Sequence, residues 1–232
     1  KFVALSYRVD GLARLRLMPI DAAAAIVGSG APVSYSDFTD VFDVLSKADK
    51  PFYPHKDDLY SVSLGGQRAD FDFDEIAVHV DSPTGPTRTY TVALQPPPAT
   101  GVARWRARFL MEDELEVEHR RGDYCCKMVW CPDTESAGPE GVVARAAAAT
   151  PFPNERKVPC MVMYRKECFK PGKNPLFITA YGSYGETAPL EFSSAQLSIL
   201  DRGVVVASAL VRGGGELGRA WHHAGRFDAR RN

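Results

Sequence analysis

The sequence has no apolar run of the length that a membrane-spanning helix needs, about 18 residues. It also has no excess of basic residues, because 28 Lys and Arg stand against 29 Asp and Glu, a formal net charge of −1. Nucleic acids and anionic membranes both select a basic surface, so neither is expected as the main partner. Residues 1–7 contain neither a basic segment nor a long apolar core, the two features of a signal peptide, so no signal peptide is predicted there.

Cysteines are few, and their spacing does not suit a metal ion. The chain has five, namely Cys125, Cys126, Cys131, Cys160 and Cys168. No Cys-x-x-Cys or paired Cys/His spacing occurs, so neither a zinc site nor another metal or cofactor site is predicted. An odd and sparse set also argues against the disulfide framework of a secreted protein. Reduced thiols buried as small apolar groups, in a cytoplasmic protein, are the favoured interpretation.

The sequence contains no Gly-x-Ser-x-Gly, the tight turn that presents the nucleophilic serine of an α/β-hydrolase. Ser183 does not lie in such a turn and is a poor candidate nucleophile. His222 and His223 have no identifiable Ser and Asp to act with. On a hydrolase sheet Ser, then Asp or Glu, then His follow in chain order. A complete triad is therefore not expected within residues 1–232.

The first part of the chain has the pattern of short antiparallel strands. Asp10-Gly11 between two apolar runs is a strong hairpin signal. Residues 31–58, with three prolines, are interpreted as long connections or an insertion. A sandwich, a barrel or propeller blades would fit, and at about 40–45 residues a blade only two to three blades are present, too few to close a ring. Further strands are predicted at residues 59–64, 76–80 and 89–94, with weaker ones at 104–110 and 114–119.

From Gly141 onward the pattern changes to that of an α/β domain. Residues 204–207 are apolar without interruption, as expected of a strand that is buried on both faces. A strand, a helix and a buried strand in succession predict a βαβ unit. The strands are predicted at residues 142–146, 158–164, 176–181 and 203–211.

The helix between the last two strands has clear boundary signals. Ser193 is predicted as its N-cap, and Gln196 would complete a capping box. Phe192 and Leu197 stand at the positions of a hydrophobic staple, and Gly203 is predicted to close the helix.

A glycine-rich segment follows the buried strand and allows two interpretations. Gly213, Gly215 and Gly218 match the G-x-G-x-x-G pattern of dinucleotide-binding folds. That pattern also needs an acidic residue about 20 positions later, and only 14 residues follow Gly218. The other interpretation is a tight turn between strand and loop, which needs positive φ and close backbone packing.

The motifs between residues 173 and 225 stand in an order that is specific in combination. They are residues 174–177 (preceded by Lys173), 181–185, 200–203 and 211–218, continuing to Trp221. With these motifs the chain resembles the prolyl oligopeptidase family of serine peptidases, most of all its oligopeptidase B branch, which cuts short peptides after Lys or Arg.

The resemblance continues upstream and implies an architecture. Residues 10–17 and 74–94 are similar to the last blades of the family's propeller, and residues 158–166 to the opening hairpin of its hydrolase domain. The resemblance implies that the chain contains the C-terminal blades of a seven-bladed β-propeller, followed by the first strands of an α/β-hydrolase domain. Residues 1–138 would be the partial propeller, with the insertion near 31–58. Residues 139–232 would be the start of the peptidase domain, cut before the catalytic Ser, Asp and His, so that this fragment is inactive alone.

The resemblance also assigns roles to residues. Tyr181 stands where the family places a tyrosine whose hydroxyl stabilises the tetrahedral oxyanion. Two acidic residues that hold a basic side chain in the second subsite of the oligopeptidase B branch correspond here to Pro189 and Glu191, so one acid is lost. The motif Arg212, Gly213, Gly214, Gly215 and Glu216 is assigned as a structural loop.

Two other functions stay open. One is a truncated family member that serves only as a binding module, and the other is a nucleotide-binding α/β domain that uses the segment from Gly213 to Gly218. The favoured prediction is a serine peptidase without a cofactor, acting on short peptides.

Overall fold

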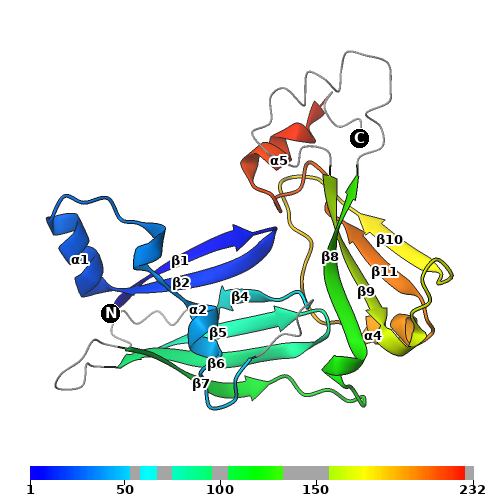
Figure 1. The fold of residues 1–232 in the computed structure, drawn as a ribbon, viewed down its shortest axis with the longest axis horizontal. Coiled ribbons are helices and arrows are strands. Elements are labelled where there is room, and N and C mark those ends of the chain that lie inside the picture. The colour runs from blue at the N-terminus through cyan, green and yellow to red at the C-terminus, as the bar shows by residue number, and fades with distance from the viewer. Residues whose placement is uncertain (53–57, 67–74, 96–103, 133–156, 228–232) are drawn as a thin grey trace.

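The computed structural model describes residues 1–52, 58–66, 75–95, 104–132 and 157–227 (Figure 1). The described strands form three sheets, in the orders β1-β2-β3, β4-β5-β6-β7 and β10-β11-β9-β8. The strands are β1 (Phe2–Val9), β2 (Leu12–Pro19), β3 (Thr39–Asp40), β4 (Ser61–Leu64), β5 (Glu75–Ser82), β6 (Gly85–Gln95), β7 (Arg104–Glu112), β8 (Tyr124–Pro132), β9 (Lys157–Arg165), β10 (Leu176–Ala180) and β11 (Val205–Ala209). The helices are α1 (Ile20–Gly28), α2 (Val41–Leu45), α4 (Ser194–Leu200) and α5 (Arg219–Ala224), with the short 3-10 helices η1 (Tyr35–Asp37), η2 (Arg121–Asp123) and η4 (Lys166–Cys168).

The predicted hairpin at the start of the chain is confirmed. Strands β1 and β2 pair antiparallel, with Val9 opposite Leu12 at the turn. Asp10 and Gly11 both have positive φ, +50° and +82°. Two successive left-handed residues make the turn that suits the twist of a two-residue hairpin, which explains the Asp-Gly pair.

The second sheet, β4 to β7, is an antiparallel meander that follows chain order. The predicted strands at 59–64, 76–80, 89–94 and 104–110 correspond to its four members. Every second residue of β5 is buried, so one face of this sheet covers an apolar core. That core contains Ile76, Val78, Val80, Tyr90 and Val92, together with Leu15, Leu17, Val41, Leu45 and Phe52 from preceding segments.

Two expectations for the first part, long connections over residues 31–58 and a strand at residues 114–119, are wrong. Within the described part of residues 31–58 lie η1, β3 and α2, and Val41, Leu45 and Phe52 are buried, so this segment contributes to the core. Residues 114–119 form no strand. Alternation of acidic and apolar residues there does not produce a strand, because a strand also needs a neighbour to accept its backbone hydrogen bonds.

The third sheet contains the predicted βαβ unit. Strand β10 is parallel to β11, and α4 lies between them in the chain. Strand β9 is antiparallel to both β11 and β8, so the sheet is mixed. Val205, Val206 and Ala207 are buried in β11, as predicted. Strand β10 lies at the sheet edge and is exposed along its length.

The capping of α4 is only partly as predicted. Ser193 occupies the N-cap position, but its side chain makes no capping hydrogen bond, so the capping box with Gln196 is not formed. Gly203 has φ of +79° and donates its N–H to the carbonyl oxygen of Leu200, which ends the helix.

The predicted division of the chain at residues 138 and 139, and the predicted strand at 142–146, lie outside the described residues. Strand β8 precedes that division, yet it pairs with β9 over its whole length. The mixed sheet therefore begins at Tyr124, and the described chain passes from the meander to the mixed sheet over residues 113–123.

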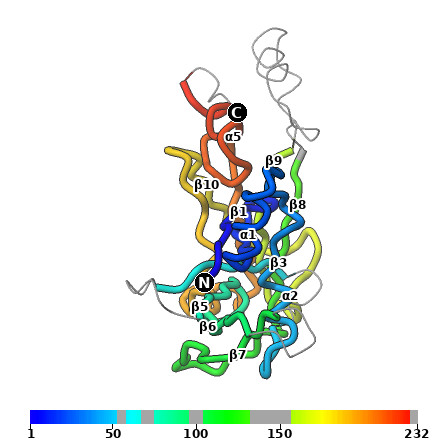
Figure 2. The backbone as a smooth tube through the Cα atoms, turned by 90° about the vertical axis from the view of Figure 1, so that its left-hand side faces the viewer, coloured from blue at the N-terminus to red at the C-terminus, as the bar shows by residue number. Residues whose placement is uncertain are grey.

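The meander and the mixed sheet pack against each other. The N–H of Leu59 donates to the carbonyl oxygen of Cys126 at 3.0 Å, and Leu59 is buried with Tyr124 and Leu197 in a second core. Both views place α5 and β7 at opposite ends of the molecule (Figure 1, Figure 2). In the described residues the strands do not close into a barrel or a ring.

Candidate functional site

Tyr181 is the first residue after β10, and the residue is 64% exposed. The chain then bends sharply, since Gly182, Tyr184 and Gly185 all have positive φ, from +58° to +71°. A left-handed tyrosine is uncommon and costs backbone energy, so surrounding contacts must hold this segment in place. We call residues 181–188 the tyrosine loop.

The segment after β11, residues 212–218, packs tightly against the tyrosine loop, and we call it the glycine loop. Gly213 has φ of +100°, and a Cβ built there would collide with the carbonyl oxygen of Gly182. A Cβ on Gly215 would collide with the carbonyl oxygen of Gly185. Glycine is therefore required at both positions, because the two backbones approach too closely for a side chain.

Three hydrogen bonds join the two loops. The N–H of Gly185 donates to the carbonyl oxygen of Gly213 at 3.0 Å, and the N–H of Gly215 donates to that of Glu186 at 2.8 Å. The third bond is from the N–H of Ala188 to Oε1 of Glu216, at 3.0 Å. The loops after β10 and β11 thus form one connected unit.

The backbone hydrogen bonds of the glycine loop bear on its two interpretations. The N–H groups of Gly213, Gly214, Gly215 and Gly218 all donate to backbone carbonyl oxygens of the chain itself. A dinucleotide site needs such groups free to receive a pyrophosphate at the start of a helix. The hydrogen bonds therefore give no support to a nucleotide-binding loop, and they favour the interpretation as a tight structural turn.

A cavity of about 480 Å³ lies at the C-terminal ends of β10 and β11. The structure brings Tyr181, Glu191 and Glu216 to its wall, and Pro189 lines it as well. The loop residues Arg212, Gly213, Gly214 and Gly215 do not line it. Other lining residues include Met161, Met163, Thr179, Ala180, Glu186, Phe192, Gln196, Val206, Ser208 and Ala209.

The cavity is acidic. Glu186, Glu191 and Glu216 line it, and among the described residues no Lys, Arg or His does. No ion pair joins any of the three carboxylates to a Lys or Arg in the part of the chain that the structure describes. A cavity lined by charge of one sign raises the local concentration of the opposite charge, so cationic groups are favoured here.

Two residues of the cavity could not be identified from the sequence. Glu186 is not indicated there at all, and Glu216 is predicted only as part of a structural loop. Glu186 has no spacing that marks it. Glu216 is only 7% exposed, and a charged residue this buried is unusual, but burial depends on the packing of two distant loops.

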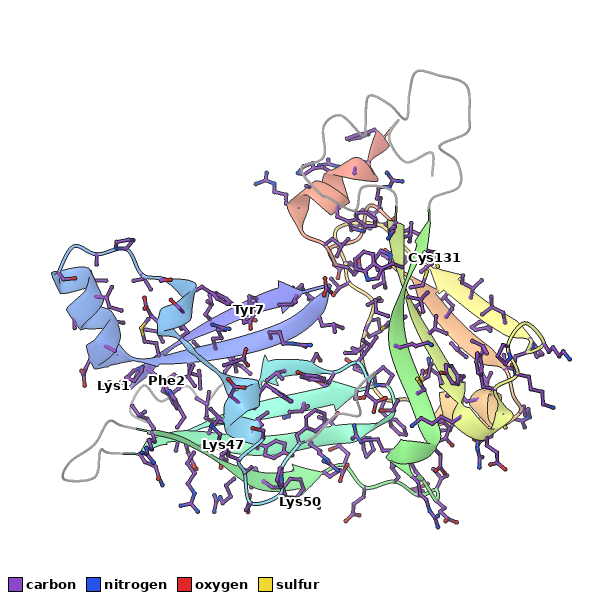
Figure 3. The ribbon with its side chains drawn as sticks, viewed as in Figure 1. Lys1, Phe2, Tyr7, Lys47, Lys50 and Cys131 are labelled. Atoms are coloured by element: carbon purple, nitrogen blue, oxygen red, sulfur yellow. The ribbon has the colours of Figure 1, made fainter. Side chains whose placement is uncertain are left out.

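The five cysteines are free, and Cys131 lies towards the C-terminal end of β8 (Figure 3). Burial raises the pKa of the Cys160 thiol to about 11 and that of Cys126 to about 12, so both are held as thiols. Among the described residues, no three or more His, Cys, Asp or Glu side chains gather in a way that could hold a metal ion. No helix there has the length and apolar character to cross a membrane.

Comparison with family models matches residues 190–232 to the prolyl oligopeptidase family. Dipeptidyl aminopeptidase BI of Pseudoxanthomonas mexicana is 49% identical over 71 residues, which are 31% of this chain and 10% of that protein. Protease 2 of Moraxella lacunata is 28% identical over 174 residues, 75% of this chain and 21% of that protein. The chain thus spans about a tenth to a fifth of these curated relatives.

Solved structures share the fold over nearly the whole chain. Oligopeptidase B from Trypanosoma brucei with covalently bound antipain matches with a TM-score of 0.64 and 24% identity, covering 97% of this chain and 26% of that one. Oligopeptidase B from Leishmania major matches with a TM-score of 0.65 and 21% identity, covering 97% and 25%. A structure from a study of two prolyl endopeptidases matches with a TM-score of 0.60 and 25% identity, covering 99% and 25%.

Proposed function

We propose that the intact protein is a serine endopeptidase that cleaves short peptides after Lys or Arg. The confirmed resemblance to the prolyl oligopeptidase family supports this proposal. The observation that carries this proposal is the acidic cavity at the ends of β10 and β11, with Tyr181 on its wall.

Tyr181 is proposed as the oxyanion donor. A nucleophilic serine, deprotonated by a histidine, would attack the peptide carbonyl, and negative charge would develop on its oxygen. A hydroxyl held in advance at that position stabilises the charge more in the transition state than in the bound substrate. The resulting acyl-enzyme would be released by water. Since residues 1–232 contain no Gly-x-Ser-x-Gly, the nucleophile would come from elsewhere in the intact protein.

Glu191 is proposed to bind a basic substrate side chain. It lines the same cavity as Tyr181, and no Lys or Arg among the described residues forms an ion pair with it. Pro189 occupies the place of the second family acid and supplies no charge. Glu186 and Glu216 keep the cavity acidic, which supports a cationic occupant in spite of that loss.

The meander β4 to β7 is proposed as one propeller blade, because four antiparallel strands in chain order are the unit of such a fold. The sheet of β1, β2 and β3 would belong to a neighbouring blade. The propeller would admit only short peptides to the peptidase domain, whose sheet begins at Tyr124 rather than after residue 138. A cytoplasmic location is proposed from the cysteine pattern.

The proposal is tested by hydrolysis of chromogenic peptides by the intact protein. Peptides ending in Arg with Arg or Ala at the preceding position should both be cleaved, the first with the higher kcat/KM. Glu191→Gln should reduce the preference for Arg over Ala at the preceding position. Glu118→Gln changes an exposed glutamate that does not line the cavity, so it should leave this preference unchanged. Residues 1–232 alone should show no hydrolysis, and turnover that a serine-directed inhibitor abolishes would contradict this.

A non-catalytic binding module is the second candidate, because the cavity is present in residues 1–232 and a nucleophile turn is not. A fluorophosphonate probe separates the two functions. Covalent labelling of the intact protein supports the peptidase, whereas binding of a basic peptide without labelling supports the module.

A further inference from the structure

We propose that Glu216 is a positioning residue for catalysis, which holds the tyrosine loop and thereby the Tyr181 hydroxyl through a hydrogen bond to Ala188. This inference rests on the proposed function, because it assigns Glu216 a role only if Tyr181 acts as the oxyanion donor.

The hydrogen bond joins a buried carboxylate to the loop backbone. Oε1 of Glu216 accepts from the N–H of Ala188 at 3.0 Å, and the residue is only 7% exposed. Its Oε2 is buried as well and has no hydrogen-bond partner in the described part of the chain. A bond to an ionised acceptor away from water is stronger than one between neutral groups, so the Ala188 contact is the main polar anchor of this side chain.

The surroundings of Glu216 leave its side chain little freedom. A Cβ on Gly214 would collide with Oε2 of Glu216, so the missing side chain at Gly214 provides the space for the carboxylate. On another side the β1–β2 hairpin approaches, and a Cβ built on Gly11 would lie 3.1 Å from the Cβ of Glu216. A side chain confined in this way fixes the position of the group that it binds.

The same hairpin contacts the tyrosine loop next to Ala188. Nη2 of Arg8 donates to Oγ1 of Thr187 at 3.2 Å, while Nη1 of Arg8 donates to the carbonyl oxygen of Gly11 at 2.9 Å. The tip of β1–β2 thus closes over the point where Glu216 meets the loop. This contact is exposed and is expected to contribute less than the buried Ala188 bond.

Tyr181 depends on its loop for orientation. Its side chain is largely exposed, and its hydroxyl makes no hydrogen bond within the described residues. An oxyanion donor must stand within 2.7–3.1 Å of the developing charge. If the Ala188 anchor is lost, the loop and the hydroxyl shift, and a displacement of about 1 Å can cost about 100-fold in rate.

Three substitutions at Glu216 in the intact protein test the anchor. Glu216→Gln keeps an acceptor oxygen of the same reach and should retain kcat within about threefold, while KM for a basic peptide should rise because the cavity loses a negative charge. Glu216→Met has a similar volume without the acceptor and should lower kcat by about 10-fold to 100-fold, while its KM should rise no more than that of Glu216→Gln, because both variants remove the same charge from the cavity. Glu216→Asp keeps the charge but is too short to reach Ala188, and it should lower kcat as Glu216→Met does. If Glu216→Met prevents folding, Glu216→Asp decides, and wild-type kcat in Glu216→Asp would overturn the inference.

A double-mutant cycle separates positioning from general destabilisation. In the Tyr181→Phe background the hydroxyl is absent, so Glu216→Met should lower kcat by no more than about twofold further. If Glu216→Met lowered kcat as much in the Tyr181→Phe background as it does alone, Glu216 would act independently of the hydroxyl, and the inference would be overturned. An unchanged kcat in Tyr181→Phe alone would instead remove Tyr181 from the proposed site, a different failure.

Hydrogen exchange on the intact protein gives a readout that needs no activity. The amide of Ala188 should exchange faster in Glu216→Met than in the wild type, and at the wild-type rate in Glu216→Gln. Equal exchange in all three proteins would contradict the anchor.

Discussion

Gly185 and Gly213 are joined by a hydrogen bond of 3.0 Å between two loops that leave adjacent strands of the mixed sheet. The carbonyl oxygen of Gly213 also accepts a bond of 2.7 Å from Nδ1 of His222. One carbonyl therefore links the tyrosine loop, the glycine loop and α5. The candidate site consequently depends on the backbone geometry of Gly185 and Gly213 as well as on its side chains.

Substitution of Gly213 should be markedly destabilising. Gly213→Ala adds a Cβ at φ of +100° and also places it against the carbonyl oxygen of Gly182. Gly218→Ala is a matched control, because φ is +87° there and a Cβ would meet nothing within 4 Å. We expect a cost of about 1–2 kcal/mol for Gly218→Ala and a larger one for Gly213→Ala, measured by urea unfolding. Equal costs would show that the close approach does not matter.

Tyr124 is predicted to stabilise the mixed sheet through Asp201. Its hydroxyl donates to Oδ1 of Asp201 at 2.8 Å, and Arg165 donates to the same oxygen at 2.9 Å. Burial raises the pKa of Tyr124 to about 12, and the nearby Asp201 carboxylate adds to the shift, so the hydroxyl stays protonated. Tyr124→Phe should lower the free energy of unfolding by about 1.5 kcal/mol.

The control for this prediction is Tyr60→Phe. The Tyr60 ring is also packed in a core, but its hydroxyl makes no hydrogen bond among the described residues. A loss in Tyr60→Phe as large as that in Tyr124→Phe would mean that the Asp201 bond adds nothing to stability.

His119 is predicted to make stability fall in acid. Its ring stacks on Tyr124 at 5.5 Å between centroids, meets Phe192 edge-on at 5.2 Å, and is partly buried. Burial holds the pKa of His119 below its ordinary value of 6.5, a shift that the backbone of Thr84 opposes and that Arg121, Glu112 and Asp123 modify. The unfolded chain then takes up a proton at higher pH than the folded chain, so stability present above pH 6.5 is lost as the pH falls below it.

The measurement is the midpoint of thermal unfolding between pH 7.5 and 5 for the wild type and for His119→Phe. The variant keeps an aromatic ring and cannot titrate, so its midpoint should fall less over this range. Parallel curves for the two proteins would show that His119 does not contribute to the acid sensitivity.

Features set by neighbouring residues could be predicted from the sequence. Asp10-Gly11 fixes a hairpin through its own backbone preference, and the buried strand β11 follows from an unbroken apolar run. Helix α1 was not predicted, although four consecutive alanines after Asp21 favour a helix.

Features that depend on distant partners could not be predicted. Nothing in residues 124–132 shows that β8 joins the mixed sheet, because strand pairing is decided by packing across the chain. Tyr181 and Glu191 were identified through the family resemblance, whereas the bond from Ala188 to Glu216 appears only when both loops are in place. The roles proposed for these residues remain predictions.

The central claim is that Tyr181 stabilises the oxyanion, and kcat of Tyr181→Phe in the intact protein tests it most directly. Loss of one such donor costs about 2.7–4 kcal/mol, so kcat should fall by about 100-fold to 1,000-fold while KM changes little. Tyr184→Phe, in the same loop and 85% exposed, should keep the wild-type kcat. An unchanged kcat in Tyr181→Phe, or an equal fall in both variants, would contradict the account.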